Sequence, residues 1–493
     1  MNNRSKIIIT ITLAFMFAIL FFLICEKKPP EKKPSQISIP EPKKIKEPTK
    51  KTTVTPLKRK KVVKISPPKI IKKSTIQDDN DLACGRCKTK SFYNSGLTYG
   101  LSLSPIIIDQ RDGTNSLTSN VTTAKFGFKT YIYENTFLYL RVKNVFLGIL
   151  NKSGYEIDNY DNFFDLELAY LDFYNSDYSL NIAAGRKYFI LGTGLTFNGR
   201  GDGLELKYFS KYLNLQLFGA YTGLLLKEDN PYELSSKDIT DGAKRIFAGG
   251  SIAKEMYNQT IYLLGLSQID LSSQKNSRYN SQYYGLGLKG LALDNLSYYA
   301  EFIYETGKSY LSGTENKKNI NAFATTMGLN YYLNLFLNPV LIFQYAFGSG
   351  DKDRDNYNLS TGNTAGEDNG FITFGTFTAG YALRPLLSNI HIIRGGFSIN
   401  PFLWSKKKYL NKMILTSKYT LYLKDKTEAP LNDGQQATLN KKLIGHAFDL
   451  EIKWKAFYDL AIFFNYGLFI PGDAYDSSEG NKQFFLLGTI INF

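Results

Sequence analysis

The segment Phe448-Asp449-Leu450-Glu451-Ile452-Lys453-Trp454 alternates strictly between apolar and charged residues. The same period of two recurs at 204–208, at 213–217 and in the final residues 485–493. Successive side chains of a β-strand point to opposite faces, so this pattern predicts strands with one apolar and one polar face. A soluble β-sandwich has the same alternation, so the alternation alone does not decide the fold.

Three further features favour a membrane barrel. The alternating segments are about ten residues long, which is the length that crosses a bilayer when a strand is tilted. Tyr and Phe cluster at their ends, as in the aromatic girdles of outer-membrane barrels. The chain ends on Phe493, and a terminal aromatic after alternating apolar residues resembles the bacterial barrel-assembly signal. We therefore predict an all-β fold, a transmembrane antiparallel β-barrel of about 18 strands, with a disordered Pro/Lys-rich N-terminal extension.

The predicted strands occupy 96–108, 121–133, 136–148, 163–174, 178–190, 203–209, 212–221, 244–256, 260–269, 281–292, 296–305, 321–333, 338–347, 389–400, 410–423, 444–454, 458–468 and 484–493. An even number of strands places the two chain ends of the barrel on the same side of the membrane. Tight turns such as Glu134-Asn135 follow even strands, and longer links follow odd strands, at 149–162, 222–243, 306–320, 348–388 and 424–443. Short periplasmic turns opposite long outer loops are typical of bacterial outer-membrane barrels.

The N-terminal part divides into two segments before the barrel at 91–493. Residues 1–25 contain an uncharged stretch, Ile7–Cys25, after Arg4 and Lys6, which indicates a signal peptide or an uncleaved membrane anchor. A lipid anchor at Cys25 is a third alternative. In residues 26–90 the prolines and like charges predict a disordered periplasmic linker, which is either a solvated tether or a peptidoglycan contact. Cys84 and Cys87 form a C-x-x-C pair, which favours a local disulfide over a redox site.

The basic charge belongs to the tail and not to the barrel. Residues 26–75 hold 17 Lys and Arg against four Glu, whereas residues 76–493 hold 41 Lys and Arg against 40 Asp and Glu. The high isoelectric point is therefore poor evidence for nucleic-acid binding, and we expect no nucleic-acid partner. Three Cys exclude a disulfide-built scaffold, and two His leave little for histidine-based metal or acid–base chemistry.

The candidate pore lining is the set of charged residues on the polar parity of the strands, together with Arg186 and Arg394, which lie beside glycines where a bulge can change the facing. The whole set is Arg141, Lys143, Arg186, Asp165, Glu167, Glu205, Lys207, Glu301, Arg394, Lys418, Asp449 and Glu451. This set contains both positive and negative residues, so we expect a lumen with only modest anion selectivity. Rings of Arg or Lys favour anions in pores, which makes Arg141, Lys143 and Arg186 the predicted selectivity element. The alternative is that these three simply pair with Asp165 and Glu167 across the wall.

Other chemistry-bearing residues have competing interpretations. Residues 351–355 alternate Asp with Lys and Arg, which suits either a calcium loop or, as we expect, a solvated outer loop. His391 and His446 could serve a barrel hydrolase, but His446 shares the apolar parity of Phe448, so an interfacial histidine is favoured. The inward carboxylates could do acid–base work but are expected to line water. Trp404 and Trp454 are expected in the aromatic girdle.

The segment 348–388 is too long for an ordinary connection, and such loops are usually functional or disordered. It carries Phe371, Phe374, Phe377 and Tyr381, an apolar mass that would not stay solvated alone. We therefore expect it to fold into or over the pore.

Several motifs resemble the alginate-export family of outer-membrane barrels. Gly185-Arg186-Lys187, followed by Gly192-Thr193-Gly194 and Asp202-Gly203, is similar to a hairpin of that family. Similar segments follow in order at 345–353, 388–390, 444–450 and 466–474, with Ala447 and Lys187 as departures. The resemblance spans most of 96–493 and excludes the tail. It implies an 18-stranded pore that exports an anionic exopolysaccharide and uses no cofactor.

The sequence therefore favours a non-enzymatic channel in the bacterial outer membrane, with the N-terminal extension in the periplasm. Its expected partners are outer-membrane lipid and either an anionic polysaccharide or small solutes. A general porin for small solutes is the alternative within transport. A barrel enzyme and an envelope tether acting through the Pro/Lys tail are alternatives from other classes.

Overall fold

The computed structural model describes residues 97–155, 159–274, 276, 278–355, 360, 362–431 and 437–493. The expectations for 1–25, for the linker 26–90 and for the Cys84–Cys87 pair lie outside these residues. Within the described residues, no helix is both long and apolar enough to cross a bilayer.

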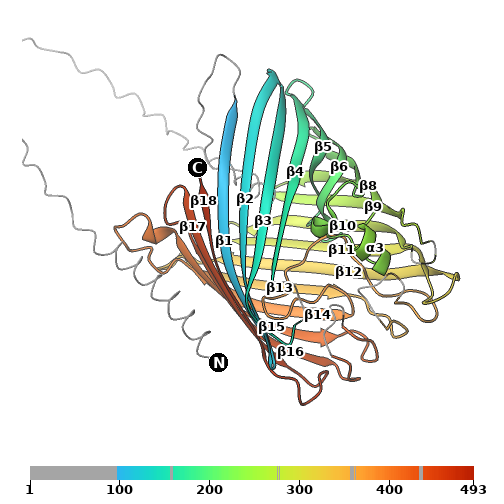
Figure 1. The fold of residues 1–493 in the computed structure, drawn as a ribbon. Helices are drawn as coiled ribbons and strands as arrows, with labels where there is room; N and C mark the ends of the chain where they lie inside the picture. The colour runs from blue at the N-terminus through green and yellow to red at the C-terminus, as the bar shows by residue number, and fades with distance from the viewer. Residues whose placement is uncertain are drawn as a thin grey trace, which may run out of the picture. The chain divides into compact units, whose positions relative to one another are not determined.

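Eighteen antiparallel strands form one closed barrel, which confirms the predicted fold and strand number (Figure 1). Each strand pairs with the next along the chain, and the last strand, Lys482–Asn492, pairs with the first, Thr98–Asp112. The strands are β1 (Thr98–Asp112), β2 (Asn115–Tyr133), β3 (Thr136–Ser153), β4 (Tyr160–Asn175), β5 (Leu180–Leu191), β6 (Phe197–Phe209), β7 (Asn214–Tyr221), β8 (Arg245–Met256), β9 (Gln259–Asp270), β10 (Asn280–Leu293), β11 (Leu296–Tyr310), β12 (Lys317–Tyr332), β13 (Val340–Gly348), β14 (Ile390–Ile399), β15 (Met413–Lys424), β16 (Leu443–Trp454), β17 (Leu460–Pro471) and β18 (Lys482–Asn492).

Alternation along the strands separates an outward and an inward face, as the sequence predicts. Large apolar side chains of one parity are exposed around the wall, among them Leu204, Leu217, Leu263, Leu286, Phe302 and Phe323. The other parity is buried and includes Phe189, Phe218, Phe247 and Tyr283. Because the exposed apolar set faces away from the charged set, the wall suits contact with lipid outside and a polar interior.

Several strands extend further than the sequence predicts, at the end of the barrel that carries the loops. β1 continues to Asp112 and β2 begins at Asn115, so a two-residue turn with Gly113 at φ +56° takes the place of residues 109–120, which separate the first two predicted strands. β6 likewise begins at Phe197 instead of 203. These extensions are rich in polar residues and lack the apolar alternation, because paired strands above a bilayer need no lipid-facing side chains.

The two ends of the barrel differ as predicted. We call them the turn end, where even strands connect by turns such as Glu134-Asn135, and the loop end. One connection at the turn end is longer. It comprises residues 400–412, contains the 3-10 helix η3 (Leu410–Lys412) and covers Trp454. Trp454 donates its indole N–H to the Tyr409 carbonyl at 2.8 Å and is only 5% exposed, so its assignment to the lipid girdle is wrong. Trp404 in that connection is 66% exposed.

At the loop end, the connection 222–244 contains the 3-10 helix η1 (Lys227–Asp229) and the short helix α3 (Ser236–Asp241). The Ser235 hydroxyl accepts a hydrogen bond from the Asp238 backbone N–H and so caps α3. Arg245 pairs with Asp238 and, at 2.9 Å, with Asp270, all three being buried. These contacts fix the connection to β8 and β9 and hold Asp229 over the lumen-facing side of β3 and β6.

Candidate functional site

The hydrogen-bonded pairing of the barrel wall is interrupted between β4 and β5. These strands pair from Asn175–Leu180 only as far as Ala169–Arg186, whereas β5 and β6 stay paired to Leu191–Phe197. Gly185 stands at the parting with φ +127°, and a Cβ there would lie 2.2 Å from the Ala169 carbonyl oxygen. Only glycine fits this conformation and close approach, so the bend depends on it.

Beyond the parting, the β5–β6 hairpin leans toward the lumen side of β4. Lower on β6, Leu204 points outward and is exposed, yet Arg200 and Asp202 on the same parity are turned toward the inward carboxylates of β4. A network of charged side chains, which we call the β3–β6 ion network, fills the space between them. It consists of Lys125, Arg141, Lys143, Asp165, Glu167, Arg186, Arg200, Asp202 and Asp229.

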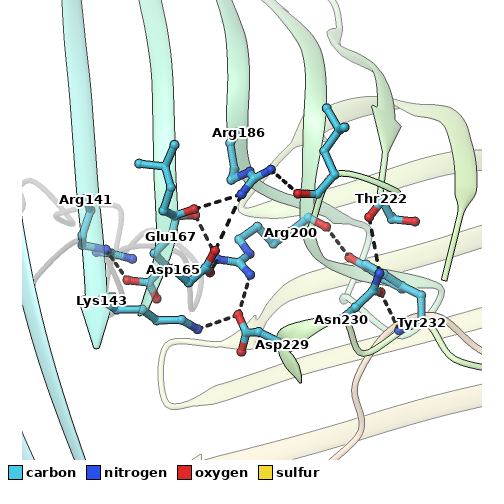
Figure 2. A network of polar contacts seen from close by, with 12 residues as sticks. Arg141, Lys143, Asp165, Glu167, Arg186, Arg200, Thr222, Asp229, Asn230 and Tyr232 are labelled. Carbon is cyan, nitrogen blue, oxygen red and sulfur yellow. Dashed lines mark hydrogen bonds and ion pairs between the residues drawn. The ribbon is translucent and has the colours of Figure 1, made fainter. Parts of the chain in front are cut away.

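Two carboxylates of β4 lie at the centre of the β3–β6 ion network (Figure 2). Glu167 accepts from Arg141 Nε at 2.7 Å and from Lys125 Nζ at 2.9 Å. Asp165 pairs with Arg200 and lies 3.7 Å from Arg186 Nη1. The β3 side and the β5–β6 side of the barrel are therefore joined through side chains of β4.

Asp229 and Asp202 complete the β3–β6 ion network. Asp229, from η1, pairs with Lys143 Nζ at 2.5 Å and also with Arg200 (Figure 2). Asp202 accepts two hydrogen bonds from Arg186, one from Nε at 2.8 Å and one from Nη2 at 3.0 Å. Such two-pronged guanidinium–carboxylate pairs fix orientation as well as charge.

The two arginines also donate to backbone carbonyls, those of Leu166 and Glu167 on β4 beyond its pairing with β5 and that of Leu224 in the connection after β7. Arg186 donates to the Leu166 carbonyl at 3.2 Å and to the Leu224 carbonyl at 2.7 Å. Arg200 donates to the Glu167 carbonyl at 3.3 Å. An unsatisfied carbonyl in a bilayer costs several kcal/mol, so guanidinium groups replace the missing strand-to-strand hydrogen bonds here.

A second, smaller group of charges lies lower on the same wall. Glu205 is fully buried and pairs with Lys187 and, at 3.2 Å, with Lys207, and it accepts from the Gln216 amide at 2.8 Å. Two lysines thus surround one carboxylate. This group adds a further positive charge to the side of the lumen that already holds the β3–β6 ion network.

The long connection between β13 and β14, residues 349–389, enters the barrel and is here called the inner loop. Its first part follows β12, where Asp368 exchanges backbone hydrogen bonds of 2.8 Å with Asn319 and Asn321. Ile372 then donates its N–H to Glu305 at 2.9 Å and accepts from the Tyr283 hydroxyl at 2.7 Å. These contacts hold the loop against the inward face of β10–β12.

The tip of the β5–β6 hairpin meets the middle of the inner loop. Phe374 N–H donates to the Thr196 carbonyl at 3.2 Å, and Thr376 N–H donates to the Gly194 carbonyl at 3.0 Å. The Phe374 ring packs edge-on against Phe247, with ring centroids 5.0 Å apart. Two segments that are distant in sequence therefore close over one part of the lumen together.

The inner loop then reaches the opposite wall. Arg394 donates to the Thr378 carbonyl at 2.9 Å and to the Ala379 carbonyl, and the Tyr422 hydroxyl donates to the same Ala379 oxygen at 2.8 Å. Asp449 accepts the Tyr381 N–H at 3.1 Å. Burial, with Glu451 and Asp449 nearby, raises the pKa of Tyr381, whose hydroxyl therefore stays protonated. The expectation that 348–388 folds into the pore is confirmed.

The predicted pore-lining residues fall into separate groups. Arg141, Lys143, Arg186, Asp165 and Glu167 come together in the β3–β6 ion network, and each of the three basic residues is ion-paired. Their role in selectivity is not decided by that pairing and stays a prediction. The remaining members of the predicted set are Glu205, Lys207, Glu301, Arg394, Lys418, Asp449 and Glu451.

Residues on β14–β16 form the opposite charged wall. Lys418 is the register partner of Asp449, and Glu451 pairs with Lys453 at 2.6 Å. Glu301 departs from the expectation that it lines water paired with basic residues. It is buried and accepts from the Thr193 N–H at 2.8 Å, the Thr193 hydroxyl at 2.6 Å and the Tyr262 hydroxyl at 2.5 Å, which fixes the turn of the β5–β6 hairpin.

Sequence reasoning missed four members of the network, namely Lys125, Arg200, Asp202 and Asp229. A signal was present for Lys125, which alternates with Phe126 and Phe128 on β2. No such signal marks Arg200, which lies in Asn198-Gly199-Arg200-Gly201 without apolar alternation, or Asp229, which lies in a connection.

The calcium and hydrolase interpretations receive no support. Asp351 and Arg354 are buried whereas Lys352 and Asp355 are exposed, so the expectation of a solvated outer loop at 351–355 holds for only part of the segment. Asp351 accepts the backbone N–H groups of Asp353, at 2.9 Å, and Asn369, at 3.0 Å, and burial raises its pKa. Within the described residues, no three His, Cys, Asp or Glu side chains are grouped to hold a metal ion.

Both histidines lie beside tyrosines. His391 Nδ1 is 2.9 Å from the Tyr345 hydroxyl, and His446 Nδ1 is 2.6 Å from that of Tyr419. The Phe448 side chain on the parity of His446 is exposed. This placement agrees with an interfacial role for His446.

Comparison with protein families gives one match. Residues 260–487 match the alginate export family, which confirms the resemblance over that segment, from β9 into β18. The hairpin motif at 185–203 lies outside the matched segment. Among curated proteins, no relative matches this chain.

Solved structures share the barrel fold at low sequence identity. OccK5 (OpdH) of Pseudomonas aeruginosa is 10% identical with a TM-score of 0.54, over 80% of this chain and 98% of that one. OccAB1 of Acinetobacter baumannii is 11% identical with a TM-score of 0.54, over 83% and 98%. OpdK of Pseudomonas aeruginosa, solved with vanillate, is 10% identical with a TM-score of 0.50, over 80% and 99%. At this identity the likeness concerns the fold alone.

Proposed function

We propose that this protein is a bacterial outer-membrane channel that exports an anionic polysaccharide, with its N-terminal extension in the periplasm. The barrel fold, the lipid-suited outer face and the alginate export match of residues 260–487 support the channel. The inference that the substrate is anionic rests on the excess of positive charge along one wall of the lumen. We propose no enzymatic activity and no cofactor.

The observation that carries the proposal is the excess of cations on the β2–β6 side of the lumen. The β3–β6 ion network sets Lys125, Arg141, Lys143, Arg186 and Arg200 against Asp165, Glu167, Asp202 and Asp229. The group below it adds Lys187 and Lys207 against Glu205. Lys125 keeps a quarter of its side chain exposed, so part of this charge reaches the water-filled space.

The first prediction concerns ion selectivity. Replacing Arg141, Lys143 and Arg186 by Gln removes three positive charges and should shift the reversal potential in a salt gradient toward cations. Planar-bilayer recordings of the purified full chain measure this shift. Lys125→Gln alone, at the most exposed cation of the network, should shift it in the same direction by less.

A charge-balanced variant is the matched control. Arg141→Gln combined with Glu167→Gln removes an ion pair without changing the net charge, so its reversal potential should stay at the wild-type value. If the triple variant also keeps the wild-type selectivity while it still folds and conducts, the wall does not select anions. The protein would then be better described as a general porin.

A porin that takes up small solutes is the second candidate, and the inner loop favours it. A loop fixed across the lumen narrows the path, and the barrels that share this fold include one solved with vanillate. Liposomes loaded with uronate oligomers or with single sugar acids separate the two functions. Release of oligomers supports export of a chain, whereas release of single sugars alone supports the porin.

The N-terminal extension and any tethering role call for separate tests. N-terminal sequencing of the envelope-extracted protein decides whether 1–25 is removed, and recovery of Met1 would contradict cleavage. Deletion of 26–90 should leave channel conductance unchanged while lowering retention by purified peptidoglycan, if the basic linker contacts it.

A further inference from the structure

A polar cavity of about 210 Å³ lies at the loop end of the barrel. It is open to solvent on one side, and it is lined by the ends of β1 and β18, by the connection after β3 and by the inner loop. Its lining includes Gln110, Arg111, Asp112, Tyr155, Arg384 and Lys482. Since one water occupies roughly 30 Å³ of liquid, the cavity has room for about seven waters, which is the scale of a single sugar ring.

The charges of this cavity do not balance. Arg111 pairs with Asp109 at 2.9 Å, and Lys482 pairs with Asp112 at 3.0 Å. Arg384 has no carboxylate within ion-pair distance among the residues that the structure describes. Within the part of the chain that the structure describes, two basic residues of the cavity are therefore neutralised locally and the third is not.

The guanidinium of Arg384 is nevertheless held in place. Its Nε donates to the Tyr381 carbonyl at 2.9 Å, and its carbon lies 4.2 Å from the centre of the Phe484 ring. A cation stacked on an aromatic face is stabilised by the ring without being neutralised. This arrangement leaves the two terminal nitrogens, which form the fork that binds carboxylates, available to a ligand.

We propose that this cavity binds the carboxylate of a sugar acid, with Arg384 as the anion-binding group. The amides of Gln110 and Gln483 and the hydroxyl of Tyr155 line the same space and suit the hydroxyl groups of such a ligand. The site is distinct from the β3–β6 ion network. It deepens the proposed function, on which it rests, by placing a uronate at the loop end of the channel.

Calorimetric titration of the full-length protein in detergent with glucuronate tests the proposal. Arg384→Gln should weaken binding by about tenfold or more, the usual effect of losing a charge-assisted hydrogen bond. Asp112→Asn removes the negative charge from the cavity and should strengthen binding. Glucose, which has no carboxylate, should not bind.

Arg278→Gln is the matched control. Arg278 lies in a different connection at the loop end and likewise donates its Nε to a backbone carbonyl, that of Ser272, at 2.8 Å. It should bind glucuronate as wild type does. Equal affinity in Arg384→Gln and wild type, or equal binding of glucose and glucuronate, would overturn the site. That result leaves the reversal-potential test untouched, so failure of the site and failure of the channel proposal are distinguishable.

Discussion

Arg200 connects three parts of the protein through one side chain. It pairs with Asp165 of β4 and Asp229 of η1, and it donates to the Glu167 carbonyl. A buried carboxylate has lost its hydration, so it is stabilised only while its cationic partner is present. The position therefore matters for stability at least as much as for the charge of the lumen.

We predict that Arg200→Gln lowers the free energy of unfolding by about 3 kcal/mol, because buried Asp165 would lose its closest cation and keep only the 3.7 Å contact with Arg186. Denaturant unfolding in detergent micelles measures this change. Lys237→Gln is the comparison, since Lys237 pairs with Asp241 on an exposed surface of α3 and should cost less than about 1 kcal/mol. A similar small loss for both variants would mean that the β3–β6 ion network is not what holds β4 and β5 together.

Gly375 is a second position where one atom decides the local structure. A Cβ there would lie 2.1 Å from the carbonyl oxygens of both Gly194 and Leu195, against which the inner loop packs. Since these are backbone atoms, the loop itself must move. We predict that Gly375→Ala loosens the inner loop and raises single-channel conductance. Gly395→Ala is the control, because nothing lies within 4 Å of its added Cβ, and its conductance should not change.

At the scale of elements, the inner loop and the β5–β6 hairpin depend on each other. The hairpin turn is fixed by Glu301 through Thr193, and the loop docks on that turn through Phe374 and Thr376. The loop then ends its crossing on Arg394 and Asp449. The two elements are therefore held in place by contacts with each other, and we expect them to act as one constriction.

We predict that replacing 372–380 by a short Gly-Ser link increases conductance and reduces discrimination between large and small solutes, because the crossing segment is gone. Bilayer recordings and liposome swelling with sugars of increasing size measure the two effects. Removing 477–479 from the connection between β17 and β18 shortens another loop-end segment that lies on the surface and should change neither. Unchanged conductance after the first deletion would show that the inner loop does not limit the path.

The sequence predicts all eighteen strands, because each has to present apolar side chains to lipid at every second position. It does not predict the parting of β4 and β5, because alternation shows which residues share a face but not what that face meets. Arg186 and Arg200 thus stand on a parity that is lipid-facing elsewhere on the same strands, at Leu204 for example. The loop-end extension of β1 was missed for a related reason, since residues 109–112 pair without alternating.

The candidate site was predicted in part. Arg141 and Lys143 lie beside the β4 carboxylates because adjacent strands bring inward residues of similar height into contact, whereas Arg186 reaches Asp165 only because β5 parts from β4. Asp229 could not be placed, since it reaches the network from a connection whose path depends on Arg245 and Asp238. The position of Arg384 depends likewise on the docking of the inner loop.

At the scale of the whole molecule, the charged residues are distributed unevenly around the lumen. The body of the chain is almost neutral, with 41 basic and 40 acidic residues in 76–493. Cations nevertheless exceed anions on the β2–β6 side, where Lys125, Lys187 and Lys207 accompany the arginines. A nearly neutral barrel can therefore present a positive path to a solute that follows one side of the lumen.

The pairing of β1 with β18 also governs how the protein is made. Ser102 meets Asn492 in this pair, so the contact that seals the barrel joins nearly the whole length of the folded chain. Pairings between such distant segments form slowly, because the chain entropy is lost before the contact is gained. Until then two strand edges stay open, and an open edge can pair with another molecule. The interval before closure is thus when the chain is most prone to aggregate and most in need of assistance from the assembly machinery of its membrane.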